Sequence, residues 1–206
     1  MVEKNESSLN SRINPNKKTE NQEKDVLSYL RELVFGIVGV LLVLMLVFRV
    51  VVVSGPSMME TLYNGDCLLV LGNVFYSKPE YGDIIVVSKD SFKDGEPIIK
   101  RVIASEGQKI DIDFEKGIVF VDDQPLDESY VRTPTNLFEG ISFPLVVDDG
   151  CYFVMGDNRN DSKDSRSVEI GLIDSREILG RAVFLLIPAK DESTHKRDFT
   201  RIGALW

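Results

Sequence analysis

Two residues of the chain have the types needed for nucleophilic catalysis without histidine. Ser57 lies in a turn that contains glycine and proline, and Lys100 lies in an apolar run typical of a strand. With strand alternation Lys100 shares a face with Ile98 and Val102, so its amine is desolvated and the neutral form is favoured. A neutral lysine can take the proton of a serine hydroxyl, which Arg101 cannot do because arginine stays protonated in proteins. Taken singly, Ser57 can equally be a turn former, and Lys100 a lysine that extends from the sheet to solvent.

A third segment contributes polar groups rather than a nucleophile. The turn spans residues 54–62, the apolar run spans residues 98–104, and residues 156–166 follow another apolar run. This last segment has three acidic and three basic side chains within eleven positions. It is either a solvated polar turn or a hydrogen-bonded loop that holds a catalytic group in position.

The composition limits which functions are possible. The chain of 206 residues has a formal net charge of −9, and from residue 50 onward acidic residues outnumber basic ones by 27 to 17. We therefore expect no nucleic acid partner, because phosphates require a basic surface. One histidine and two cysteines cannot supply the four ligands of a structural zinc site, so we expect no metal and no cofactor. A Ser-His-Asp triad would have to use His195.

One element must place these residues at a membrane. Residues 33–48 contain no polar side chain, and with Arg49 and residues 50–53 the segment has 21 residues, or about 31 Å of helix. A cleavable signal peptide would have a shorter polar lead than the 32 residues found here, and a core helix would have a polar face. We expect a polar disordered tail (1–26), a transmembrane anchor with its lead-in (27–53), a β-domain (54–190) and a C-terminal tail (191–206).

The distribution of basic residues orients the anchor. Six lysine and arginine residues precede it, whereas after Arg49 no basic residue follows until Lys78. The positive-inside rule therefore places the N-terminus in the cytoplasm and the body outside the cell membrane. Cys67 and Cys151 would then meet oxidising conditions, but both lie in apolar runs where buried free thiols are common, so their pairing stays open.

The body is predicted to be mainly β. Short runs rich in β-branched and aromatic residues are separated by Gly, Asp, Asn and Pro, and one helical turn is expected near residues 173–179. Residues 121–125 have the composition of a hairpin tip. The expected strands are residues 67–71, 83–88, 98–104, 108–112, 118–121, 145–147, 151–155 and 182–187. This pattern predicts an antiparallel barrel-like or sandwich-like domain behind one N-terminal helix.

Taken together, the three segments resemble the sequence boxes of type I signal peptidases, the membrane-anchored serine endopeptidases that remove signal peptides. The similarity runs from about Arg49 to Pro188 in family order and spacing. It rests on Ser-Met-Met-Glu-Thr-Leu at 57–62, Gly-Asp-Ile-Ile-Val at 82–86 and Lys-Arg-Val-Ile at 100–103. It also rests on Gly-Asp-Asn-Arg at 156–159, followed by Ser162, Asp164, Ser165 and Arg166. The differences are Glu60 in place of the usual proline, Pro56 before the nucleophile, and Ser-Glu-Gly at 105–107.

The resemblance implies a role for each matching residue. Ser57 is the nucleophile and Lys100 the general base, and Ser162 hydrogen-bonds the lysine amine. Asp164 and Arg166 form a structural ion pair. The Ser57 N–H is one oxyanion donor. The second donor stays unidentified, because Gly stands two residues before Ser57, as in Gram-positive-type members.

The resemblance also implies the substrate. The family binds the end of a signal peptide as an extended strand, with small residues at −1 and −3 of the cleavage site. We expect Met58, Ile99, Val102 and Asp83 to form the pocket walls. The partners are exported preproteins, membrane lipid and the secretion translocon.

Two other interpretations explain part of the sequence. A non-catalytic, membrane-tethered β-domain accounts for the anchor and the strands but not for the three matching segments. A self-cleaving repressor-type peptidase shares the Ser–Lys pair but has no anchor. The Ser-x-x-Lys at residues 193–196 has no companion Lys-Thr-Gly, so a penicillin-binding protein is excluded.

Overall fold

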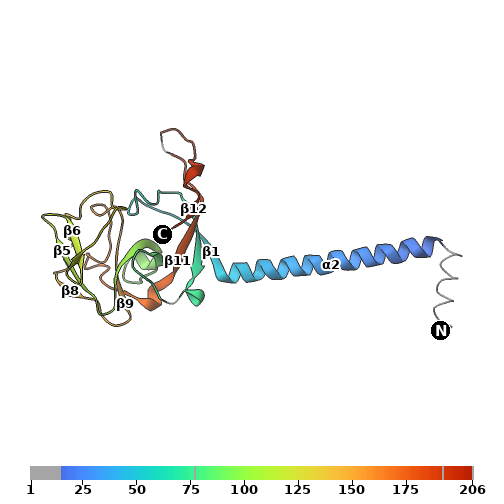
Figure 1. The fold of residues 1–206 in the computed structure, drawn as a ribbon, viewed down its shortest axis with the longest axis horizontal. Coiled ribbons are helices and arrows are strands. Elements are labelled where there is room, and N and C mark those ends of the chain that lie inside the picture. Colours follow the sequence, from blue (N-terminus) through green and yellow to red (C-terminus); the bar gives the residue numbers. More distant parts are fainter. Residues whose placement is uncertain (1–14, 77, 192, 206) are drawn as a thin grey trace. The chain divides into compact units, whose positions relative to one another are not determined.

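The computed structural model describes residues 15–76, 78–191 and 193–205 and divides the chain into two compact units. Met1–Leu46 form the first unit, and Val47–Trp206 form the second. Figure 1 shows the helix of the first unit and the strands of the second.

The described residues of the first unit all belong to helix α2 (Pro15–Val47), whose last residue is already part of the second unit. Within this helix, Asp25–Val47 have a mean hydropathy of 2.5 and no buried share, and this is the helix of the described chain that is long and apolar enough to cross a membrane. Residues 1–14 of the expected tail lie outside the described residues. Residues 15–26 are helical rather than disordered, because Pro15 suits the first helical position and lysine, glutamate and glutamine propagate a helix.

The helix ends earlier than expected. The anchor was predicted to run through residue 53, but α2 stops at Val47 and strand β1 (Phe48–Val52) begins at the next residue. Its consecutive valines are stiff at χ1 and favour a strand. They also find an antiparallel partner in β2 (Cys67–Gly72), with Phe48 opposite Leu71 and Val52 opposite Cys67.

The larger sheet of the second unit has eight strands, and every pair in it is antiparallel. The strand order is β1-β2-β11-β3-β4-β9-β10, with β12 paired to β11. The remaining members are β3 (Ile84–Val87), β4 (Ile98–Ser105), β9 (Cys151–Met155), β10 (Ile173–Asp174), β11 (Ile178–Ile187) and β12 (Gly203–Ala204). Strand β4 lies inside this sheet, with β3 paired on one side and β9 on the other, so both neighbouring strands fix the position of its backbone.

A second sheet has the order β7-β6-β5-β8. Its strands are β5 (Lys109–Asp113), β6 (Ile118–Val121), β7 (Gln124–Pro125) and β8 (Leu145–Val146). Asp122 and Asp123 form the predicted hairpin tip with positive φ values of 50° and 64°, as a tight hairpin turn requires. In Figure 1, β5, β6 and β8 lie together at one end of the body and β1, β11 and β12 at the other. The prediction of a mainly antiparallel β-domain is confirmed.

Four short 3₁₀ turns connect the strands: η1 (Asn73–Phe75), η2 (Lys93–Gly95), η3 (Ser175–Glu177) and η4 (Phe199–Arg201). Turn η3 lies where a helical turn was expected, and Asp174 and Glu177 cap it reciprocally. Residues 191–206, predicted as a tail, contribute η4 and β12, and Ala204 pairs with Phe184 of β11.

The core consists of three clusters of buried apolar side chains. One of them contains Val53, Met58 and Leu62 together with residues of β2, β3 and β11. The turn that carries Ser57 is therefore anchored at three points in the core, which fixes its path. Cys67 and Cys151, whose pairing was left open, are both free thiols.

Candidate active site

Ser57 lies on a tight turn between β1 and β2. The N–H of Met59 donates to the carbonyl of Pro56 at 3.1 Å, and the N–H groups of Thr61 and Leu62 both donate to the carbonyl of Met58, at 2.9 and 2.8 Å. Met58 and Leu62 are buried, whereas the Ser57 side chain is half-buried. The turn thus presents one hydroxyl while its neighbours hold the backbone in place.

Lys100 reaches this hydroxyl from the middle of β4. Its Nζ lies 2.8 Å from Oγ of Ser57 and donates to the carbonyl of Ile99 at 3.0 Å. The lysine is only 3% exposed. A buried amine at hydrogen-bond distance from a serine hydroxyl has the geometry of a nucleophile and its general base.

The loop after β9 fastens the turn from the other side. Asn158 donates from its backbone N–H to the carbonyl of Ser57 at 3.0 Å and from Nδ2 to the carbonyl of Pro56 at 3.2 Å. A Cβ on Gly156 would lie against Oγ of Ser162 and the carbonyl oxygen of Ser57, well inside van der Waals contact. Only glycine fits between the loop and the turn, a role that the sequence analysis did not assign to Gly156.

Asp164 is the centre of this loop. Its carboxylate accepts two hydrogen bonds from the Arg166 guanidinium, both at 2.8 Å, and one from the Arg166 N–H at 3.3 Å. It also accepts from the N–H of Gly156 and from Oγ of Ser162, each at 2.9 Å. Burial raises the pKa of Asp164, but the hydrogen bonds and charge of Arg166, the Gly156 N–H and the charge of Lys100 outweigh it and leave the pKa below its ordinary value. The ion pair expected between Asp164 and Arg166 is present.

Ser162 lies in the loop where the resemblance predicts it, and its hydroxyl donates to Asp164. The Ser162 hydroxyl donates this hydrogen bond at 2.9 Å, and the residue lines the same cleft as Ser57 and Lys100. The hydrogen bond expected between Ser162 and the lysine amine stays a prediction. With its proton committed to Asp164, the Ser162 oxygen keeps free lone pairs that can accept from an ammonium.

Arg101, on the opposite face of β4, holds the same parts together from behind. Its Nε and Nη2 donate to the two carboxylate oxygens of Asp157 at 2.9 and 2.7 Å, and both side chains are buried. Thr61 donates to the same carboxylate from the nucleophile turn, and Tyr130 covers the guanidinium at 4.1 Å. Arg101 cannot be the base, and this role could not be predicted from the sequence because its partner Asp157 lies 56 positions away.

A cleft of about 280 Å³ runs along the two reacting groups. Residues 51–58 form one wall, residues 96–100 form another, and residues 161–163 close the site beside Ser57. Met58 and Ile99, both predicted as substrate-binding residues, line this cleft.

Two predicted pocket residues do not line it. Val102 is fully buried in the core, since β4 turns this side chain toward Ile85 and Val154. Asp83 accepts hydrogen bonds from Tyr76 and from the N–H of Glu80, and it pairs with Arg181 at 3.0 Å. Both side chains therefore make their contacts in the sheet and lie outside the lining of this cleft.

A serine hydroxyl beside a buried lysine is the pairing of side chains that serine hydrolases of the Ser–Lys class use. The family model described as "Signal peptidase, peptidase S26" matches residues 26–187, so the chain belongs to the S26 signal peptidase family. Its members are serine endopeptidases, as the resemblance implied.

The chain is also similar to individual proteins. "Probable signal peptidase I-1" of Synechocystis is 39% identical over 145 residues, which cover 66% of this chain and 70% of the relative. "Signal peptidase I S" of Bacillus subtilis is 31% identical over 182 residues, which cover 83% of this chain and 95% of the relative. A crystal structure of a signal peptidase I from Enterococcus faecalis is 27% identical and covers 50% of this chain and 96% of its own, with a TM-score of 0.41.

Proposed function

We propose that the chain is a membrane-anchored signal peptidase I in which Ser57 is the nucleophile and Lys100 the general base. The observation that carries this proposal is the 2.8 Å separation of Nζ and Oγ, with the lysine buried. Neutral Lys100 takes the Ser57 proton as Oγ attacks the scissile carbonyl. The resulting ammonium gives that proton to the leaving amine, and water then hydrolyses the acyl-enzyme with Lys100 again as base.

The residues around the pair have separate tasks. Asp164 and Arg166 hold the loop, and Ser162 accepts a hydrogen bond from the Lys100 ammonium. The Ser57 N–H donates to the oxyanion of the tetrahedral intermediate. These groups keep the reacting atoms in place, and Gly156 allows the loop to approach the turn this closely.

The cleft supports an extended peptide with small side chains. Its volume is only about 280 Å³, and Met58 and Ile99 line it beside Ser57 and Lys100. A segment ending in a small-x-small motif places its small side chains against these walls. The substrates are accordingly exported preproteins that carry signal peptides.

We place the N-terminus in the cytoplasm and the β-domain on the outer side of the cell membrane. The six basic residues before the apolar segment, against Arg49 alone after it until Lys78, support this orientation. Ser57 follows the end of α2 at Val47 by ten positions, so at most about 36 Å of chain separates them. Membrane lipid and the secretion translocon are then the neighbours of the domain.

Cleavage of a preprotein by the detergent-solubilised protein tests this function. Wild-type enzyme should cut after a small-x-small motif, and Ser57→Ala should reduce processing to background, because it removes the nucleophile but creates no cavity. Ser162→Ala should retain part of the activity, since it disturbs the base without removing it. Processing by Ser57→Ala at a rate near wild type would rule out this nucleophile.

A further inference from the structure

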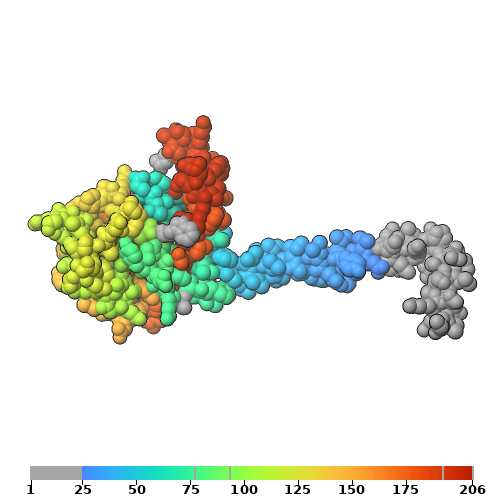
Figure 2. Space-filling view, viewed as in Figure 1, coloured from blue at the N-terminus to red at the C-terminus, as the bar shows by residue number. Residues whose placement is uncertain are grey.

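The nucleophile turn also contributes to a second cleft, of about 620 Å³. Met59, Tyr63 and Asn64 of the turn form one wall, and the C-terminal segment of residues 189–201 forms the other. Met58 lines the first cleft and Met59 the second, so adjacent residues of one turn contribute to both clefts. Figure 2 shows the C-terminal segment, in red, standing beside the cyan segment that follows Ser57.

The base of this second cleft is held rigidly. Arg201 donates to both carboxylate oxygens of Asp66, at 3.1 and 2.6 Å, and to the carbonyl of Thr61 at 3.3 Å. Its guanidinium also lies 4.4 Å from the centre of the Tyr63 ring, and the Asp66 side chain is fully buried. The C-terminal segment is therefore fixed to the same turn that carries the nucleophile.

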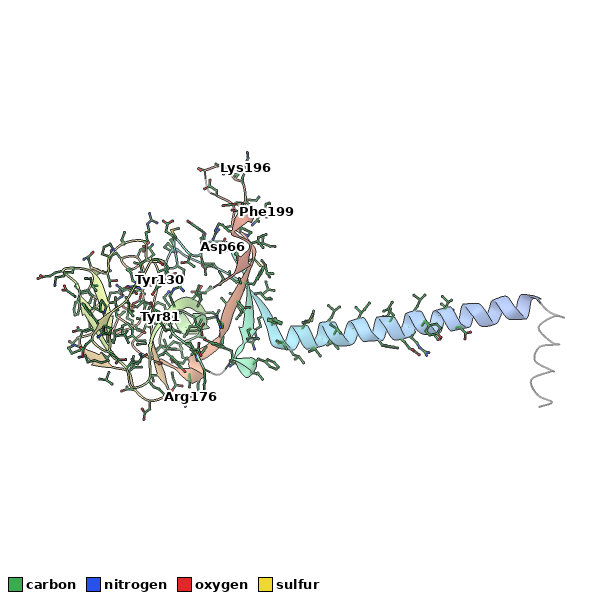
Figure 3. The ribbon with its side chains drawn as sticks, viewed as in Figure 1. Asp66, Tyr81, Tyr130, Arg176, Lys196 and Phe199 are labelled. Carbon is green, nitrogen blue, oxygen red and sulfur yellow. The ribbon has the colours of Figure 1, made fainter. Side chains whose placement is uncertain are left out.

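The described lining has more basic than acidic side chains: Lys190, Lys196, Arg197 and Arg201 against Asp191 and Asp198. The two aspartates are exposed and charged, and they accept hydrogen bonds within the segment, Asp191 from Ser193 and Thr194 and Asp198 from Thr200. Lys190 and Lys196 are exposed, and in the described part of the chain neither has a side-chain ion pair or hydrogen bond. Lys196 projects from the loop at the tip of this segment (Figure 3).

We propose that this second cleft binds the first residues of the mature protein, beyond the scissile bond, and that it favours acidic side chains there. The inference rests on the proposed function. The signal-peptide half of the substrate occupies the first cleft up to Ser57, so the other half must leave on the far side of the turn. An extended chain advances about 3.3 Å per residue, which brings residues a few positions after the cleavage site past Met59.

Binding to the full-length Ser57→Ala variant tests the site independently of cleavage. The probe is a fluorescent ten-residue peptide that represents a mature N-terminus with three glutamates, and its counterpart has three lysines. Fluorescence anisotropy should show tighter binding of the acidic peptide. Lys190→Glu/Lys196→Glu should weaken it about three- to tenfold, whereas Lys78→Glu/Lys116→Glu, the matched control with the same charge change, should not.

Cleavage provides the second measurement. Substrates that share one signal-peptide segment but carry acidic or basic residues at positions +4 to +6 should differ in kcat/KM in favour of the acidic one. Lys190→Glu/Lys196→Glu should reverse this ratio, and added salt should shrink it. Equal binding of both peptides, or a ratio unchanged in this variant, would overturn the proposal. A substrate that ends two residues after the cleavage site cannot reach the second cleft and tests cleavage alone. Failure of the wild-type enzyme to cut it would contradict the proposed function instead.

Discussion

At the scale of single residues, the site depends on close contacts between the nucleophile turn and the loop after β9, where no additional atom fits at Gly156. Ser57 and Lys100 meet at 2.8 Å only because Asn158 holds the Ser57 carbonyl and Gly156 lets the loop approach. The types of the two reacting residues could be inferred from the sequence. Their separation could not, because it depends on contacts between residues about 100 positions apart.

Gly156→Ala should abolish efficient cleavage. The added methyl must displace either Ser162 or the Ser57 carbonyl, and a shift of about 1 Å in a reacting group costs about 100-fold in rate. Gly203→Ala is the control, because a Cβ at that glycine meets no atom within 4 Å. Steady-state cleavage of a peptide substrate measures both. Unchanged kcat in Gly156→Ala would show that the loop tolerates the methyl group and that the close approach is dispensable.

Asp164→Asn should destabilise the protein in a pH-dependent manner. The pKa of Asp164 lies below its unfolded value, so its carboxylate stabilises the fold at pH values above about 4, and this contribution is lost as the pH falls through the folded-state pKa. Breaking the buried pair with Arg166 should cost about 3 kcal/mol at neutral pH.

Thermal unfolding of the detergent-solubilised chain from pH 7 to pH 3 checks this expectation. The difference in Tm between wild type and Asp164→Asn should be largest at pH 7 and should narrow in acid. Asp149→Asn, an exposed control, should follow wild type throughout. A difference in Tm that grows as the pH falls would contradict the sign of the argument.

At the scale of elements, alternating and β-branched runs predicted most strands within one or two residues. Strand β11 begins at Ile178, four residues before the predicted start at residue 182, and two further boundaries were missed. The apolar run through residue 53 contains no sequence break, so the change from helix to strand at Phe48 is decided by pairing with β2. The C-terminal segment has little apolar periodicity, and it folds because Arg201 reaches Asp66, 135 positions away.

Arg201→Ala should therefore loosen the C-terminal segment. The substitution leaves the buried Asp66 carboxylate without its charged donor, which should cost about 2 kcal/mol. Hydrogen exchange should rise in β12 and in η4, while β4 and β9 stay protected. Arg176→Ala is the matched control, since its pair with Asp174 is exposed. Equal exchange in wild type and Arg201→Ala would show that this ion pair does not hold the segment.

At the scale of the whole molecule, the chain combines an apolar helix with an acidic catalytic domain. Protease added to protoplasts should digest the β-domain and spare the segment before the helix, because the basic residues lie on the N-terminal side. An epitope at each end distinguishes the fragments, and a cytoplasmic protein serves as the control for lysis. Protection of the β-domain in intact protoplasts would reverse the orientation.

The central claim is that Lys100, rather than histidine, accepts the Ser57 proton. The most direct test is the pH dependence of kcat/KM for peptide cleavage by wild type, Lys100→Arg and His195→Ala. Wild-type activity should rise with pH along a limb that reports loss of a proton from Lys100. Lys100→Arg should be inactive because its guanidinium keeps its proton, whereas His195→Ala should match wild type, since the exposed His195 does not line the cleft around Ser57. An active Lys100→Arg enzyme, or an inactive His195→Ala enzyme beside a wild-type limb near pH 6.5, the usual range of histidine, would contradict the Ser–Lys assignment.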